Sequence, residues 1–172
     1  MRRLRNAWMN AANEPHDQSS LIVDITLDEA SIDRNTAEIE HERQVAIFDI
    51  LEANNFSIDD GAAGPYRLRL AIVEKRLVID ILSEARSPLT TFVLSLSPLS
   101  KLIKDYFLVC GSYYEAIKSA PPSRIEALDM GRRALHDEGS RLLIERLQGK
   151  ITTDFDTARR LFTLICTLHW KG

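Results

Sequence analysis

The first residues that could carry out chemistry lie in the stretch EIEHER, residues 38–43. Glu38 and His41 stand three positions apart, so on a helix they share one face and could share a proton or a ligand. A zinc protease helix requires His-Glu-x-x-His, and a di-iron bundle requires a second Glu-x-x-His helix; the sequence has neither motif. We therefore predict no metal and no cofactor. The alternative to a ligand site is a solvated, charged helix face.

A second candidate stretch is DMGRRALHDEGS, residues 129–140. Four residues at four-residue spacing alternate in charge, as is typical of an exposed helix face: Asp129, Arg133, Asp137 and Arg141. Arg132, His136 and Ser140 form a neighbouring row that this ladder does not explain. Such a row could bind an anion, with the histidine as acid or base, or it could be a helix edge half in water.

Two further arginines, Arg159 and Arg160, precede the most apolar stretch of the chain, LFTLICTL at residues 161–168. A buried guanidinium without a partner is costly. We therefore expect both arginines to reach solvent or to meet carboxylates, with residues 38–42 as one candidate partner for Arg159. A structural use is the expectation for this pair.

These residues support two hypotheses about function. The first is a non-enzymatic protein-binding or regulatory module whose partner is another protein or a second copy of the chain. It rests on the lack of a Gly-rich phosphate loop, a nucleophile elbow and a Cys-x-x-Cys pair. The second is a small enzyme or metabolite-binding protein for a phosphorylated or carboxylate ligand. Its site would gather both candidate stretches: Glu38, His41, Arg43, Arg132 and His136.

Composition narrows the class of protein. With 172 residues, 45% of them hydrophobic and 27% charged, the chain fits one soluble domain of ordinary size. A net charge of −3 argues against nucleic-acid and anionic-membrane partners. No apolar run approaches the roughly 20 residues of a membrane span, and no secretory signal follows the basic start, so we expect a cytoplasmic protein. Cys110 and Cys166 are expected to be buried thiols rather than a disulfide.

The element expected to organise the fold is the stretch YRLRLAIVEKRLVIDIL, residues 66–82. Apolar residues alternate with polar or small ones on both sides of a charged break, which is typical of a β-hairpin. Pairing Ile72 with Leu77 makes one face of the hairpin wholly apolar. On the other face, the same register places Arg69 opposite Asp80. This opposite-charge pair favours that register.

The remaining patterns predict strands at residues 21–27 and 90–96 and helices at residues 36–54, 97–118, 123–147 and 155–170. The first strand alternates strictly, with Val23 and Ile25 on the same side. The apolar stripe of the second helix is wide, so we expect this helix to be buried on more than one side. The expected caps are Thr36, Ser97, Ser123 and Asp154. Gly131 and Gly139 are expected to allow close approach of another helix, with a bend at Gly139 as the alternative.

The order strand, helix, three strands, three helices predicts an α+β fold. It would consist of a four-stranded, mainly antiparallel sheet with the helices packed on one face. Residues 1–19 are polar and without periodicity, so we expect a disordered tail there and a single domain over residues 20–172. Met9 is a second candidate start, so nothing is inferred from the basic residues before it.

Six phrases, in this order, resemble a bacterial family designated only as an uncharacterised protein family: DITLDEASI (24–32), EIEHERQVAIFDILE (38–52), GPYRLRL (64–70), KDYFLVCGSYYEAI (104–117), IEALDMGRRALHDEGS (125–140) and DFDTARRLFTLICTLHW (154–170). The resemblance covers essentially the whole chain from Leu21 onward. It implies a small bacterial cytosolic protein. It implies no activity, cofactor or catalytic residue, so the two hypotheses on function rest on the residues themselves.

Overall fold

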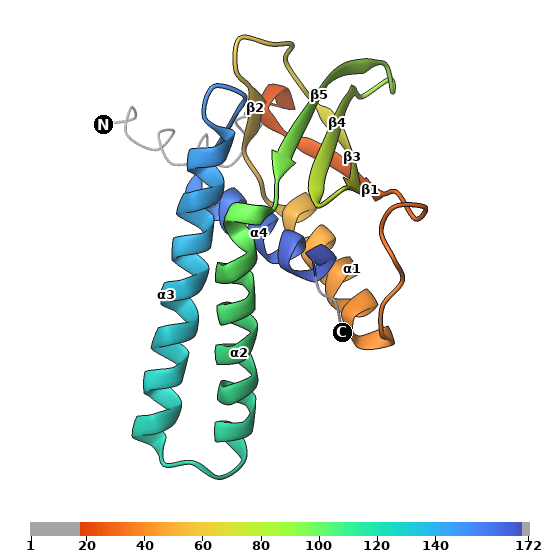
Figure 1. Ribbon diagram of the computed structural model, residues 1–172. Coiled ribbons are helices and arrows are strands. Elements are labelled where there is room, and N and C mark those ends of the chain that lie inside the picture. Colours follow the sequence, from red (N-terminus) through yellow and green to blue (C-terminus); the bar gives the residue numbers. More distant parts are fainter. Residues whose placement is uncertain (1–17, 170–172) are drawn as a thin grey trace, which may run out of the picture.

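The computed structural model describes residues 18–169, which form an α+β fold with a four-stranded sheet, a two-stranded sheet and four α-helices (Figure 1). In chain order the elements are a 3-10 turn (Gln18–Ser20), β1 (Ile22–Leu27), α1 (Ala37–Glu52), β2 (Phe56–Ile58), β3 (Tyr66–Val73), β4 (Arg76–Ser83), β5 (Pro88–Ser95), α2 (Ser97–Ser119), α3 (Pro122–Leu147), β6 (Ile151–Thr153) and α4 (Phe155–His169). The predicted α+β class is confirmed. The sequence patterns do not predict the short antiparallel pair of β2 and β6. Residues 1–17 of the expected tail at residues 1–19 lie outside the described residues.

The β3–β4 hairpin has the predicted register, with Ile72 paired to Leu77. The turn between the strands consists of Glu74 and Lys75, whose φ angles are 52° and 61°. Positive φ at both turn residues is the geometry that matches the right-handed twist of a two-residue hairpin. Alternation and a short charged break are therefore sufficient to predict this element.

The outer face of the sheet forms different ion pairs from those predicted. Arg69 lies opposite Asp80 in the strand pairing, as expected. Its guanidinium, however, pairs with Asp28 at 3.1 Å, whereas Asp80 accepts a hydrogen bond of 2.6 Å from Thr91. The charges on this face thus tie β3 to the end of β1 and β4 to β5.

Strand β1 lies parallel to β3, because α1 forms the crossover between them, and the other strands of this sheet pair antiparallel. The prediction that β1 alternates strictly is wrong. The pairing shifts between Ile22 and Asp24, which leaves Val23 as an extra residue. This bulge allows Ile22 and Ile25 both to be buried, at 1% and 6% exposure, although they are three positions apart.

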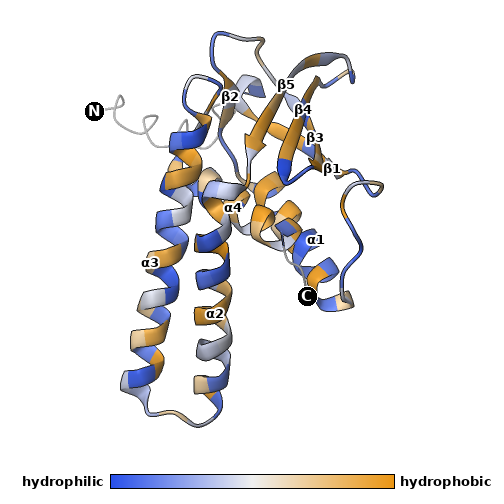
Figure 2. Ribbon diagram, in the orientation of Figure 1, coloured by the Kyte–Doolittle hydropathy of each residue, from blue (hydrophilic) through white to orange (hydrophobic). Residues whose placement is uncertain are grey.

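Helices α1 and α4 cover the apolar face of the sheet, and apolar residues gather where these layers meet (Figures 1 and 2). Helix α4 is central, as predicted, with Phe162 and Leu164 fully buried. Cys166 is buried and Cys110 is half-buried, and both are free thiols. The cap predictions at Thr36 and Asp154 are confirmed, since each accepts a hydrogen bond from the backbone N–H three residues later.

Helices α2 and α3 form a hairpin that extends away from the sheet (Figure 1). The predicted serine caps, Ser97 and Ser123, are wrong because both residues lie inside the helices and neither helix has a side-chain cap. The prediction that α2 is buried on more than one side is also wrong, because Leu108 and Tyr114 are 63% and 62% exposed. Neither these helices nor any other helix within residues 18–169 has the length and apolarity needed to span a membrane.

Candidate functional site

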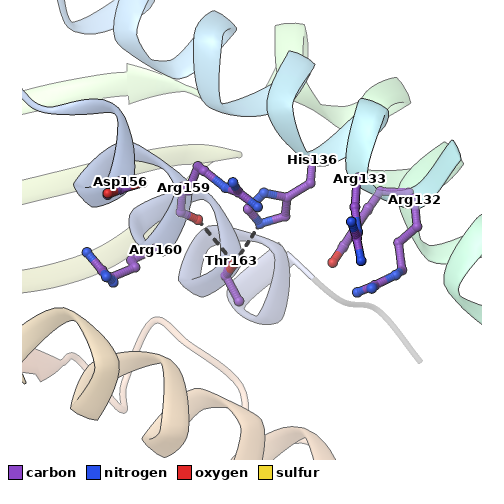
Figure 3. A pocket seen from close by; sticks show the side chains of 8 residues that line it. Arg132, Arg133, His136, Asp156, Arg159, Arg160 and Thr163 are labelled. Carbon is purple, nitrogen blue, oxygen red and sulfur yellow. Dashed lines mark hydrogen bonds between the residues drawn. The ribbon is translucent and has the colours of Figure 1, made fainter. Parts of the chain in front are cut away.

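A cavity of about 410 Å³ lies beside the helical hairpin, where α3 packs against α4 (Figure 3). Its lining residues come from three helices: Tyr106 of α2; Arg132, Arg133 and His136 of α3; and Asp156, Arg159, Arg160 and Thr163 of α4. Four of the eight are arginines. The cavity is therefore the part of the described chain where basic side chains from two helices converge around a histidine.

His136 forms one wall of this cavity and is only 9% exposed. Its ring packs against Tyr106 at 5.5 Å and edge-on against Phe162 at 5.2 Å between ring centres. Nε2 lies 2.8 Å from the hydroxyl oxygen of Thr163, and that hydroxyl donates to the carbonyl of Arg159 at 3.1 Å. The hydroxyl has a single hydrogen, so its donation to the Arg159 carbonyl requires that the imidazole donate from Nε2.

The imidazole of His136 is neutral at pH 7. Burial, followed by the charge of nearby Arg159, lowers its pKa to about 4, although the Asp137 carboxylate acts in the opposite direction. Among the described residues, neither Nδ1 of His136 nor Oδ1 of Asp137 has a hydrogen-bond partner, and both atoms are buried. A neutral ring does not attract an anion by charge, so any such attraction in this cavity comes from the arginines.

The two arginines of α3 share one carboxylate. Arg132 donates to Oδ1 of Asp129 through Nε at 3.2 Å and through Nη2 at 2.6 Å, and Arg133 pairs with Oδ2 at 2.8 Å. The Arg132 hydrogen bond lowers the pKa of Asp129 below its ordinary value. The Arg132 guanidinium also lies over the Tyr113 ring, 5.0 Å from its centre. These contacts fix Arg132, whereas the Arg133 side chain is 68% exposed.

The two arginines of α4 are held more loosely. Nε of Arg159 lies 3.6 Å from Oδ1 of Asp137, which is an ion pair but too long for a hydrogen bond. Arg160 donates through Nη1 to the carbonyl of Ala53 at 3.1 Å. The expectation that these arginines meet carboxylates or solvent is thus confirmed for Arg159, with α3 rather than α1 supplying the partner. Besides these two arginines and Thr163, α4 contributes the exposed Asp156 to the lining of the cavity.

The structure places two of the five predicted site residues, Arg132 and His136, on the wall of this cavity. Glu38 and His41 are exposed on α1 and are not among its lining residues. Arg43 is 3% exposed and lines a different cavity, between α1 and β1. Ligand binding by any of the five stays a prediction. Within residues 18–169 no cluster of three or more metal-binding side chains occurs.

Sequence reasoning assigns Arg133 to a surface ladder and Arg159 and Arg160 to a structural role, and it does not single out Thr163. The Arg133–Asp129 pair of that ladder is confirmed at 2.8 Å. The sequence feature that could have indicated the cavity is an Arg-Arg pair on each of two helices, at 132–133 and 159–160. Two such pairs form one site only if the helices cross at the right level, and helical periodicity carries no information about that crossing.

A family model described as "Uncharacterised protein family (UPF0262)" matches residues 19–171. The chain belongs to this family. UPF0262 proteins of Brucella anthropi and Mesorhizobium japonicum are 59% and 57% identical to it over 152 residues, covering 88% of this chain and 94% of each relative. A UPF0262 protein of Rhodopseudomonas palustris is 55% identical over 159 residues, covering 92% of this chain and 98% of the relative. No solved structure matches the chain.

The resemblance predicted from the sequence phrases is therefore confirmed, and the relatives are bacterial proteins. The UPF0262 match includes all of the residues that line the cavity and the whole α2–α3 hairpin. Both features thus lie in the part of the chain that the family model describes.

Proposed function

We propose that this protein is a non-enzymatic protein-binding module that acts through the α2–α3 hairpin, with a second copy of the chain as the partner. The observation that carries this proposal is an exposed, self-complementary line of side chains on α2. Lys101, Leu108 and Glu115 recur every seven residues, which is two helical turns, so they lie along one side of the helix. All three residues are exposed, with Leu108 63% exposed.

The charges on this line fit a second copy in an antiparallel arrangement. Lys101 and Glu115 each lie seven residues from Leu108. A two-fold axis at Leu108 would bring Lys101 of each copy opposite Glu115 of the other, on either side of two facing leucines. A two-fold contact needs this kind of self-complementary patch, because the same residues must serve on both sides. The dimer would have a four-helix core built from two hairpins.

A glycine on the same side of α2 supports close approach of a second helix. The surface there is a shallow groove of about 620 Å³, and Leu108, Gly111, Ser112 and Glu115 are among its lining residues. A Cβ atom added at Gly111 would meet nothing within 4 Å, so packing within the described chain does not require glycine there. Glycine inside a helix costs about 1 kcal/mol relative to alanine. A partner helix that packs over this position would explain why residue 111 is glycine rather than alanine.

The Leu108→Glu variant tests the proposed contact. It is expected to be monomeric at concentrations where the wild type dimerises, because two carboxylates would face each other at the two-fold axis in place of two leucines. Size-exclusion chromatography with light scattering gives the mass. Met130→Glu is the matched control, because Met130 is 64% exposed but lies on α3. A monomeric wild type, or a Met130→Glu variant that dissociates to the same extent, would contradict the proposal.

A charge exchange tests the antiparallel register. Lys101→Glu alone is expected to weaken dimerisation about tenfold, because it replaces two opposite-charge pairs of roughly 0.5 kcal/mol each with two repulsive ones. The double variant Lys101→Glu with Glu115→Lys is expected to recover the wild-type dimerisation constant, because the pairs are restored in reversed order. Sedimentation equilibrium measures both constants. If the double variant were weaker than the single one, the two residues would not face each other and the register would be wrong.

A further inference from the structure

We infer that the cavity between α3 and α4 is a binding site for the phosphate group of a small phosphomonoester. This inference is independent of the proposed hairpin contact, because Lys101, Leu108 and Glu115 do not line the cavity. It rests on three observations: the hydrogen-bond donors that the arginines leave open, the excess of positive charge, and a buried ring nitrogen of His136 that has no hydrogen-bond partner within residues 18–169.

Arginine donors reach the cavity from two directions. Figure 3 shows Arg132 and Arg133 extending from α3 and Arg159 extending from α4 toward His136, whereas Arg160 of α4 extends to the other side of Thr163. A guanidinium has five N–H donors. Within residues 18–169, Arg133 has one carboxylate partner and Arg160 donates to one carbonyl. Among the described residues, the one ionic contact of Arg159 is 3.6 Å long. Most of the donors of these three arginines are therefore available to a ligand.

The charges around the cavity leave an excess of positive charge. Four guanidinium groups face three carboxylates, because Asp129 serves two of the arginines, Asp137 serves Arg159, and Asp156 lies on the wall. The neutral imidazole of His136 does not change this balance. An anion that enters here gains attraction from several guanidinium groups and meets one wall carboxylate. The excess is one positive charge, which a bound anion would offset.

The geometry favours a phosphate over a carboxylate. A carboxylate has two oxygens in one plane and is matched by a single guanidinium fork. A phosphomonoester carries about −1.5 to −2 charges and three acceptor oxygens, which suits donors that come from two helices. The cavity of about 410 Å³ also exceeds what one phosphate needs, so it has room for the organic part of the ligand beside Tyr106.

Within residues 18–169, two buried polar atoms without a hydrogen bond lie near Arg159; one belongs to His136, which lines the cavity, and the other to Asp137, which does not. Nδ1 of His136 and Oδ1 of Asp137 are buried and have no hydrogen-bond partner among the described residues. Buried polar atoms are almost always paired, and the exceptions gather at functional sites. Both atoms adjoin Arg159, whose charge is the principal electrostatic influence on His136.

Calorimetric titration with inorganic phosphate and with glycerol 3-phosphate, with glycerol as the neutral control, tests the inference. Both phosphates are expected to bind in the millimolar range or tighter at about 0.15 M ionic strength, and glycerol is not. Arg133→Gln is expected to weaken binding at least tenfold, because it removes a charged donor whose one partner within residues 18–169 is the Asp129 carboxylate. Arg141→Gln is the matched control: Arg141 is exposed on α3 but does not line the cavity.

A second readout locates the bound anion. The pKa of His136, about 4 in the free protein, is expected to rise in the phosphate complex, because a nearby negative charge favours the imidazolium form. Proton NMR of the histidine rings follows this titration. The inference is overturned if neither phosphate binds, or if Arg141→Gln weakens binding as much as Arg133→Gln. It is likewise overturned if phosphate binds without changing the His136 titration, and binding of inorganic phosphate alone would rule out a monoester.

Discussion

Replacing Arg43 by methionine is expected to lower the free energy of unfolding by about 3 kcal/mol. The Arg43 side chain is 3% exposed. It donates to the carbonyl of Thr167 through Nε at 3.2 Å and through Nη2 at 3.0 Å, and to the carbonyl of Asp33 through Nη1 at 3.0 Å. Methionine fills similar space but leaves both carbonyls without these donors. Urea denaturation followed by circular dichroism measures the loss.

This effect is large because Arg43 joins three parts of the chain. Thr167 lies in the last turn of α4, where backbone carbonyls have no partner within the helix. Arg43 satisfies one of them from α1 and at the same time holds the loop before α1 through Asp33. These contacts give Arg43 a structural role in the free protein. They do not involve Glu38 or His41, with which it was grouped as a candidate ligand site.

Two substitutions serve as controls for Arg43→Met. Arg34→Met removes an arginine from the adjacent loop, where it is exposed, and is expected to change stability by less than about 0.5 kcal/mol. Arg43→Lys keeps the charge but is expected to recover little, because an ammonium group lacks the planar fork that reaches both carbonyls. Wild-type stability of Arg43→Lys would show that charge rather than geometry matters, and this account of Arg43 would be wrong.

The parts of the fold that the sequence predicts correctly are those in which the interacting residues are neighbours along the chain. The β3–β4 register follows from alternation on both sides of one turn, because every partner is fixed once Ile72 meets Leu77. The caps at Thr36 and Asp154 bond to residues three positions away. No distant contact has to be known for either prediction.

Apart from the serine caps of α2 and α3, the predictions that fail depend on partners far along the chain. The bulge at Val23 exists because β1 pairs with β3, about forty residues later, and strict alternation in β1 itself gives no sign of it. The wide apolar stripe of α2 shows correctly that the helix is amphipathic, but it does not say how much of the stripe a partner covers. Helix α3 covers one side only, and Leu108 and Tyr114 remain exposed.

The candidate site has the same limit. Arg132 and His136 can be singled out because they share one helix face, but their proximity to Arg159 and Thr163 depends on where α3 and α4 cross. That crossing is set by Gly139, since a Cβ atom there would overlap the ring of Phe162. The sequence predicts that Gly139 allows a close approach, which is confirmed. It does not identify Phe162 as the residue that approaches.

Replacing Gly139 by alanine is therefore expected to destabilise the fold by about 2–3 kcal/mol, although alanine is the better helix former by about 1 kcal/mol. The Phe162 ring is fully buried, so it can yield only by displacing its packed neighbours or by separating the two helices. Gly131→Ala on the same helix is the matched control: the nearest atom to its new Cβ would be a Val109 methyl at 3.9 Å, an ordinary contact, so this variant is expected to be more stable than the wild type. Urea denaturation of both variants tests the opposite signs, and two stabilising substitutions would show that α3 and α4 are not in close contact at Gly139.

Because His136 lies one turn from Gly139 and forms a hydrogen bond with Thr163 of α4, separation of the helices should also lengthen that hydrogen bond. Phosphate binding should then be weaker in Gly139→Ala but not in Gly131→Ala.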